Sequence, residues 1–105
     1  MNSITPAELK SRLDSGEEIQ IIDIREIEER DICALNSEHI PMEDLQSSLQ
    51  RIRRDILVII HCKAGQRAEA AVHLLRLKHK LQNVFNLEGG IIGWAENVDP
   101  KMATY

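Results

Sequence analysis

Aromatic residues are nearly missing from this sequence, which has one Trp, one Tyr and one Phe among 105 residues. Ile, Leu, Val and Ala must therefore fill its core. The chain also has no apolar run approaching the roughly 18 residues of a membrane-spanning helix, and residues 1–10 lack the charged-then-apolar pattern of a signal peptide. We therefore expect a cytoplasmic protein that has no membrane partner.

Basic residues are outnumbered, because 13 Lys and Arg stand against 17 Asp and Glu, for a formal net charge of −4. This balance argues against nucleic acid as a partner. Cysteine is scarce as well. Cys33 and Cys62 form no Cys-x-x-Cys pair, and no His lies at zinc-ligand spacing from either. We therefore expect no metal site, no cofactor, and structural or surface positions for the four histidines.

Short apolar strands alternate with amphipathic helices along the chain. Strands are predicted at residues 19–24, 38–40, 56–62 and 83–87, and helices at 5–14, 42–51, 66–80 and 91–96, with a short acidic helical turn at 26–30. The longer strands are almost continuously apolar, which is typical of strands covered on both faces. The sequence predicts one α/β domain over residues 1–105, with a small, mainly parallel sheet flanked by helices on both faces.

Two of the predicted strands end in polar or reactive residues. The strand at 19–24 leads into Asp23-Ile24-Arg25, and the strand at 56–62 ends at Cys62. In open parallel sheets, ligands bind beyond the carboxyl ends of the strands. A loop then connects Cys62 to the helix at 66–80, and it consists of Lys63, Ala64, Gly65, Gln66 and Arg67.

This loop is suited to stabilise negative charge on sulfur. Ala64 and Gly65 are small enough for a tight curl, so the backbone N–H groups of residues 63–67 can converge above the cysteine sulfur. The start of a helix and nearby cations such as Lys63 also favour a thiolate. The competing interpretation is an inert core cysteine, the usual position of an isolated Cys. The combination of strand, cysteine, curled loop and helix start favours a reactive thiol.

Four motifs, in this order along the chain, resemble those of a rhodanese domain. They are Ile22-Asp23-Ile24-Arg25-Glu26, His39-Ile40-Pro41, Cys62-Lys63-Ala64-Gly65-Gln66-Arg67-Ala68 and Asn86-Leu87-Glu88-Gly89-Gly90-Ile91-Ile92-Gly93-Trp94-Ala95. The resemblance covers nearly the whole chain, and the last two motifs are its most specific parts. Residues 31–35 and 98–105 look most like the rhodanese domain that is fused to E1-like adenylyltransferases, the enzymes that activate ubiquitin-like sulfur carriers.

The resemblance implies a rhodanese-like fold and a sulfurtransferase in which Cys62 carries sulfur as a persulfide while residues 63–67 cradle it. Asp23 and Arg25 would support the neighbouring strand end through an ion pair or, as the alternative, contact the substrate directly. Arg67 would bind an anionic donor such as thiosulfate or hold the shape of the loop. The implied partners are a small sulfur donor and a thiol or cyanide acceptor. A ubiquitin-like sulfur-carrier protein and a cysteine desulfurase are further candidates.

Two other functions stay open on the sequence. Cys-based phosphatases and arsenate reductases have a similar site with a Cys-x5-Arg loop, whereas Cys62 and Arg67 are spaced as Cys-x4-Arg, one residue tighter. A non-catalytic rhodanese-like binding module commonly lacks the cysteine that this chain keeps. Residues 32–37 also depart from the Gly-His-Ile-Pro-Gly-Ala stretch of many rhodaneses. Cys33, in that stretch, is either structural or a second thiol that resolves a Cys62 persulfide into a disulfide.

Overall fold

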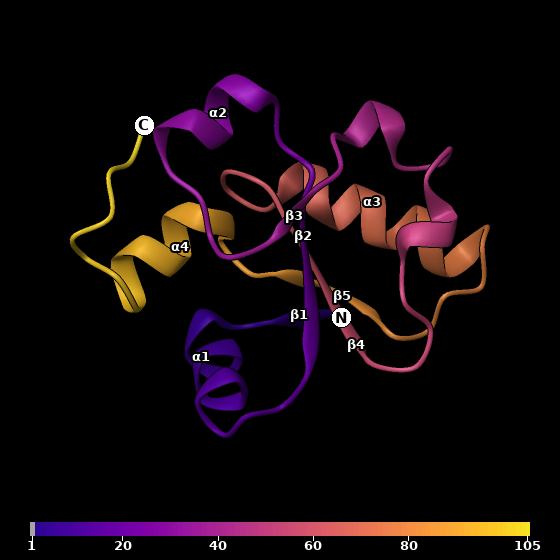
Figure 1. Cartoon of the computed structure of the whole chain (residues 1–105), viewed down its shortest axis with the longest axis horizontal. Coiled ribbons are helices and arrows are strands. Elements are labelled where there is room, and N and C mark those ends of the chain that lie inside the picture. Colours follow the sequence, from indigo (N-terminus) through magenta and orange to yellow (C-terminus); the bar gives the residue numbers. More distant parts are fainter. Residues whose placement is uncertain (1) are drawn as a thin grey trace.

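The computed structural model describes residues 2–105, and within them five parallel strands form one sheet (Figure 1). In the order of the sheet, the strands are β1 (Ser3–Ile4), β5 (Val84–Leu87), β4 (Leu57–His61), β2 (Ile19–Asp23) and β3 (Glu38–His39). All neighbouring pairs run parallel. The predicted α/β class and parallel sheet are therefore confirmed. The edge strand β1 was not predicted, because two residues are too few to show a period.

Helices cover both faces of the sheet, as predicted (Figure 1). The helix α3 (Gln66–Leu77) lies on one face, and α1 (Pro6–Asp14) and α4 (Gly90–Asn97) lie on the other. The short helix α2 (Ile27–Ile32) follows β2. None of the helices within residues 2–105 has the length and apolar character needed to cross a membrane.

Two apolar cores follow from the alternation of side chains along the strands. Ile22 and Ile60 point to one face and join a core with Ala71 and Leu75 of α3. Their neighbours Ile21 and Ile59 point to the other face, where they join a second core. That second core also contains Leu9 of α1 and Ile91 of α4. Because each face of β2 and β4 packs on a core, these strands appear in the sequence as unbroken apolar runs.

The prediction of a helix at residues 42–51 is wrong. The structure has two separate 3₁₀ turns, η1 (Met42–Asp44) and η2 (Leu49–Arg51). Ser48 interrupts them with φ −122° and ψ 23°, and the Ser47 hydroxyl donates to the carbonyl oxygen of Asp44 at 3.0 Å. Serine side chains offer the backbone local alternatives to helical hydrogen bonds, so two successive serines outweigh the apolar spacing that predicted a helix.

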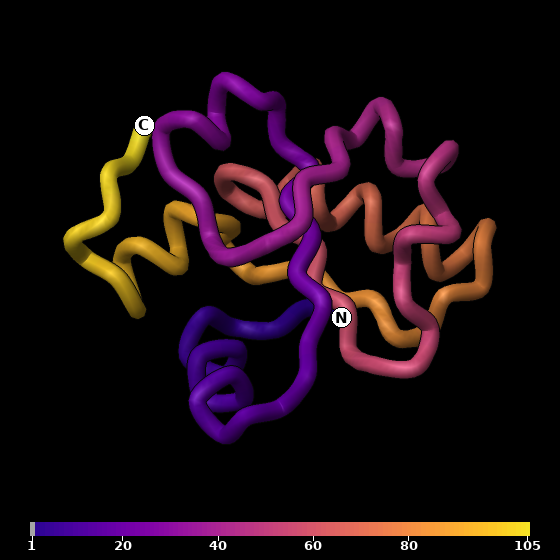
Figure 2. Tube along the Cα trace, viewed as in Figure 1, coloured from indigo at the N-terminus to yellow at the C-terminus, as the bar shows by residue number. Residues whose placement is uncertain are grey.

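The pairing of β2 with β4 brings the two reactive strand ends together. Asp23 pairs with His61, so the first strand end lies beside the residue that precedes Cys62. Residues 98–105 return to this same edge, and the yellow end of the trace in Figure 2 lies beside α2. Three segments distant in sequence therefore meet at the carboxyl ends of the central strands.

Candidate active site

Cys62 lies directly after β4 with its side chain enclosed by the loop that follows. The residue is 1% exposed, and its Sγ accepts N–H hydrogen bonds from Gly65 at 3.1 Å and from Ala68 at 3.4 Å. The predicted convergence of loop amides on the sulfur is therefore present, although the second donor lies one residue beyond the predicted range. Backbone N–H groups at the start of a helix interact favourably with negative charge, and two of them are directed at this sulfur.

Two glycines give the loop its shape. Gly65 caps α3 in the left-handed region with φ 116°. Gly90 has φ 60°, and a Cβ there would lie 2.7 Å from the carbonyl oxygen of Cys62 and closer still to that of Lys63. Such close backbone contact is possible only without a side chain.

The start of α4 also holds the loop from its other side. The N–H groups of Ile91 and Ile92 donate to the carbonyl oxygens of Cys62 and Lys63, at 2.9 and 3.1 Å. This contact was not predicted from the sequence. The Gly-Gly pair before a helix was the available signal.

Asp23 and Arg25 form the predicted ion pair, and both side chains are 0% exposed. The Arg25 guanidinium donates to both carboxylate oxygens, at 2.9 and 2.8 Å, and the Arg25 backbone N–H donates to Oδ1 at 3.0 Å. Burial alone would raise the pKa of Asp23, but the hydrogen bonds and charge of Arg25 outweigh it and hold that pKa below its ordinary value. A pair this deeply buried does not face a dissolved donor.

Arg67 does not point freely into solvent. Its guanidinium donates to both carboxylate oxygens of Glu29 in α2, at 2.8 and 2.9 Å. These hydrogen bonds, opposed by partial burial and assisted by the Tyr105 hydroxyl, lower the pKa of Glu29 to about 2. Of the two roles expected for Arg67, this geometry favours holding the loop. Glu29 was not identified from the sequence, because it lies 38 residues before Arg67.

The remaining predicted loop residues surround the cysteine. The Lys63 ammonium lies 4.5 Å from the centroid of the Tyr105 ring, while Ala64 and Gln66 are exposed. Tyr105 was not singled out either, since it stands 42 positions after Lys63 in the sequence. Of the five predicted loop residues, Gly65 contacts the sulfur, and Lys63 and Arg67 gain partners from two distant segments.

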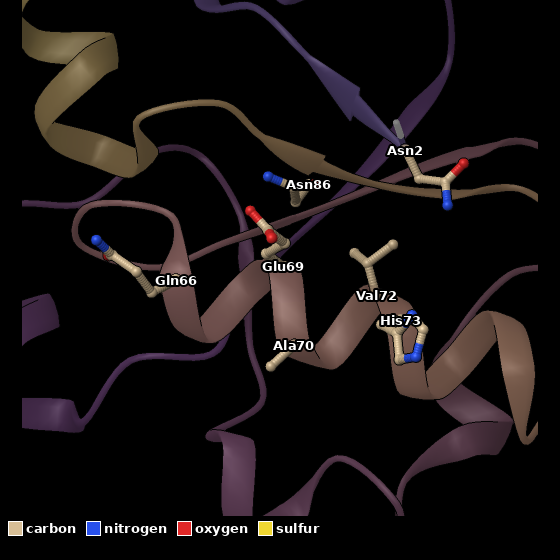
Figure 3. Close-up of a pocket in the computed structure, with 7 residues that line it drawn as sticks. All are labelled: Asn2, Gln66, Glu69, Ala70, Val72, His73 and Asn86. Atoms are coloured by element: carbon tan, nitrogen blue, oxygen red, sulfur yellow. The ribbon is translucent and has the colours of Figure 1, made fainter.

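A polar groove flanks the loop along α3 (Figure 3). Its larger part has a volume of about 430 Å³, and a smaller part of about 160 Å³ shares Gln66, Glu69 and Asn86 with it and reaches Ala64 and Gly65. The described residues that line it include no Lys or Arg, so it offers carboxylates and amides to hydrogen-bond donors and little to anions. Cys62 lines neither part, and the groove lies beside the loop of residues 63–67.

His61 is buried beside the ion pair without a full set of partners. Its Nε2 lies 4.0 Å from a carboxylate oxygen of Asp23 and has no hydrogen-bond partner among the described residues. Burial lowers the pKa of His61 to about 4, the charge of Arg25 adds to this shift, and the charge of Asp23 opposes it. The imidazole is therefore neutral at pH 7. His61 thus has the structural position expected from the sequence, and both Cys33 and Cys62 are free thiols.

Comparison with known proteins places this geometry in a family. The sequence model of the rhodanese-like domain family matches residues 5–97 of this chain. The chain is 32% identical to the probable adenylyltransferase/sulfurtransferase MoeZ of Mycobacterium tuberculosis. The matched region covers 99% of this chain but only 27% of MoeZ. It is also 32% identical to a sulfurtransferase of Allochromatium vinosum, over 98% of this chain and 96% of that protein.

The fold agrees with this result. The crystal structure of a rhodanese-like domain protein from Staphylococcus aureus superposes with a TM-score of 0.82 at 29% identity, covering 100% of this chain and 99% of that one. The similarity to MoeZ also bears out the resemblance to rhodanese domains fused to adenylyltransferases. With a family model that matches most of its length and a solved member that superposes on all of it, the chain belongs to the rhodanese-like domain family.

Proposed function

We propose that residues 1–105 form a single sulfurtransferase domain that moves sulfane sulfur through a persulfide on Cys62. The observation that carries this proposal is the set of contacts of the Cys62 Sγ. This sulfur accepts hydrogen bonds from two backbone N–H groups, inside a Cys-x4-Arg loop at the end of the sheet. The relative from Allochromatium vinosum, which matches along nearly its full length, is named a sulfurtransferase and supports the same reaction class.

The proposed reaction has two displacement steps at sulfur. The Cys62 thiolate attacks the outer sulfur of thiosulfate, the sulfur–sulfur bond of the donor breaks, and sulfite leaves with the bonding electron pair. The product is a Cys62 persulfide anion. An acceptor thiolate or cyanide then attacks the outer sulfur, and the Cys62 thiolate leaves with its electron pair. Negative charge stays on the sulfur atoms throughout, which is where the amides of Gly65 and Ala68 stabilise it.

The neighbouring side chains take supporting roles in this proposal. Lys63, at the mouth of the loop, would attract an anionic donor. Arg67 would hold the loop through Glu29, and the buried pair of Asp23 and Arg25 would hold the strand end beside it. A low-molecular-weight or protein persulfide is an alternative donor. Because MoeZ is named an adenylyltransferase as well as a sulfurtransferase, a ubiquitin-like sulfur carrier is a candidate acceptor and a cysteine desulfurase a candidate donor.

Two alternatives are weaker. A phosphatase or arsenate reductase needs room for a tetrahedral oxyanion, and here the Gly65 amide already lies 3.1 Å from the sulfur across a short loop. A non-catalytic binding module has no use for a cysteine with two amide donors directed at it.

The test is the mass of the intact protein after incubation with thiosulfate. The native protein should gain one sulfur atom that cyanide or a reductant removes, and sulfite should form in equal amount. Cys62→Ser should gain none while unfolding at the same denaturant concentration, and Cys33→Ser, the matched control, should gain one. If no donor adds sulfur to the native protein, or if both substitutions cause equal losses, the proposal is wrong.

A further inference from the structure

Tyr105 lies between the two ends of the sulfur-binding loop, although it is 43 positions from Cys62 in the sequence. The chain reaches this place by a turn in which the Met102 N–H donates to the carbonyl oxygen of Asp99 at 3.0 Å. Met102 and Tyr105 then pack against the core under α1 and α4. Figure 2 shows this yellow segment returning toward α2.

The hydroxyl of Tyr105 has two partners of opposite charge. It donates to Oε2 of Glu29 at 2.6 Å and accepts from Nη1 of Arg25 at 2.9 Å. Partial burial, and next the hydrogen bond to Glu29, raise the pKa of Tyr105, so the phenol keeps its proton and stays a donor at neutral pH. Glu29 in turn accepts both hydrogen bonds of Arg67. The hydroxyl therefore contacts, through one carboxylate, the last residue of the loop.

The ring of Tyr105 has a different partner, at the first residue of the loop. The Lys63 ammonium lies 4.5 Å from the ring centroid, well within the range in which a cation is attracted by an aromatic face. A lysine side chain is otherwise flexible, and such a contact restricts where its charge can be. The ring thus restricts the positive charge of Lys63, the residue that follows Cys62, through a contact that does not involve the hydroxyl.

We propose that Tyr105 is a positioning residue that clasps the sulfur-binding loop at both ends, with its ring holding Lys63 and its hydroxyl holding Glu29 and thereby Arg67. This inference rests on the proposed sulfur transfer for its kinetic consequences. The two parts of the side chain have separable effects. The ring governs the binding of an anionic donor, whereas the hydroxyl governs the shape of the loop whose amides stabilise charge on sulfur.

Two substitutions of Tyr105 separate these effects. Tyr105→Phe keeps the ring and removes two charge-assisted hydrogen bonds, so kcat with thiosulfate should fall by about tenfold while KM stays within about twofold. Tyr105→Leu removes the ring as well and should add a rise in KM of about threefold, because a partly exposed cation–π contact is weak. A purely structural tyrosine would give no such division between kcat and KM. Urea unfolding of both variants shows how much of any loss is due to unfolded protein.

A double substitution identifies Lys63 as the partner of the ring. In a Lys63→Met background, Tyr105→Leu should cause no further rise in KM, because the charge that the ring positions is already gone. The matched control is Phe85→Leu, since Arg76 lies 4.6 Å from the centroid of the Phe85 ring and makes the same kind of contact outside the loop. That variant should leave kcat and KM unchanged.

A chemical probe tests the clasp without any sulfur transfer. Anionic iodoacetate and neutral iodoacetamide both alkylate cysteine, and the ratio of their rates at Cys62 reports positive charge near its sulfur. The ratio should fall about threefold in Tyr105→Leu and in Lys63→Met, and stay unchanged in Tyr105→Phe and Phe85→Leu. Peptide masses distinguish Cys62 from Cys33.

The two assays separate the failure of this inference from the failure of the proposed function. If the native protein transfers no sulfur, the function is wrong, and the alkylation ratios still decide the role of the ring. Equal ratios in the native protein and Tyr105→Leu would overturn the role of the ring. A kcat in Tyr105→Phe equal to that of the native protein would overturn the role of the hydroxyl.

Discussion

Replacing Asp23 by Asn should lower the free energy of unfolding by about 3–5 kcal/mol, the usual cost of removing one partner of a buried ion pair. Asn preserves the shape of the side chain but removes its charge. The Arg25 guanidinium, 0% exposed, would then be buried without a counter-charge. Its other acceptors include the carbonyl oxygens of Cys33 at 2.7 Å and of Glu29 at 3.3 Å and the hydroxyl of Tyr105, which are neutral and cannot replace a carboxylate.

This loss is large for a domain of this size, because the total free energy of unfolding of a protein is about 5–15 kcal/mol. Urea unfolding measures it as a lower midpoint at an unchanged slope. Adding Arg25→Met should recover part of the loss, since it removes the fully buried charge that Asp23→Asn leaves without its carboxylate. Asp55→Asn is the matched control. This substitution breaks the ion pair between Asp55 and Arg53 at 2.6 Å. The Asp55 side chain is 65% exposed, and exposed ion pairs contribute little to stability.

The activity of the folded variant then distinguishes support from substrate contact. Below the urea concentration at which Asp23→Asn begins to unfold, its KM for thiosulfate should match that of the native protein, because the carboxylate does not face the mouth of the loop. A loss of stability under about 1 kcal/mol would refute the reasoning on burial. A KM raised tenfold in the folded variant would refute the supporting role.

Three further predictions follow from single features of the structure. The unfolded chain binds a proton at His61 near pH 6.5 and the folded chain only near pH 4. The free energy of unfolding should therefore fall by on the order of 3 kcal/mol as the pH drops through that window. His61→Phe should flatten the dependence of the urea midpoint on pH above pH 4.5. Gly90→Ala should lower the free energy of unfolding by about 2–4 kcal/mol in urea and abolish sulfur transfer. Its control is Gly16→Ala, because Gly16 has φ 86° and a Cβ there would have nothing within 4 Å. That variant should lose only about 1 kcal/mol through backbone strain and stay active. Inserting one Gly after Ala64 should abolish thiosulfate turnover. The native protein should not hydrolyse aryl phosphates. Sulfur transfer retained after the insertion would show that loop length does not select the substrate.

The fold class and the centre of the candidate site could be predicted from the sequence alone, because both depend on local patterns. The apolar runs at residues 19–24 and 56–62 require strands covered on both faces, and strands that alternate with helices require a parallel sheet. The strand, the cysteine and the Gly-containing loop lie within a few consecutive residues, so the amide donors to Cys62 could be predicted without knowing any distant contact.

The distant residues that hold that loop became apparent only in the folded chain. Glu29, Gly90 and Tyr105 contact it from α2, from the start of α4 and from the last residues of the chain. Their local signals are weak, because an acidic helical turn, a Gly-Gly turn and a solitary tyrosine each occur widely on protein surfaces. Their roles arise when parallel strands bring their carboxyl ends to one edge, where chain segments separated by tens of residues share a single set of charges and hydrogen bonds.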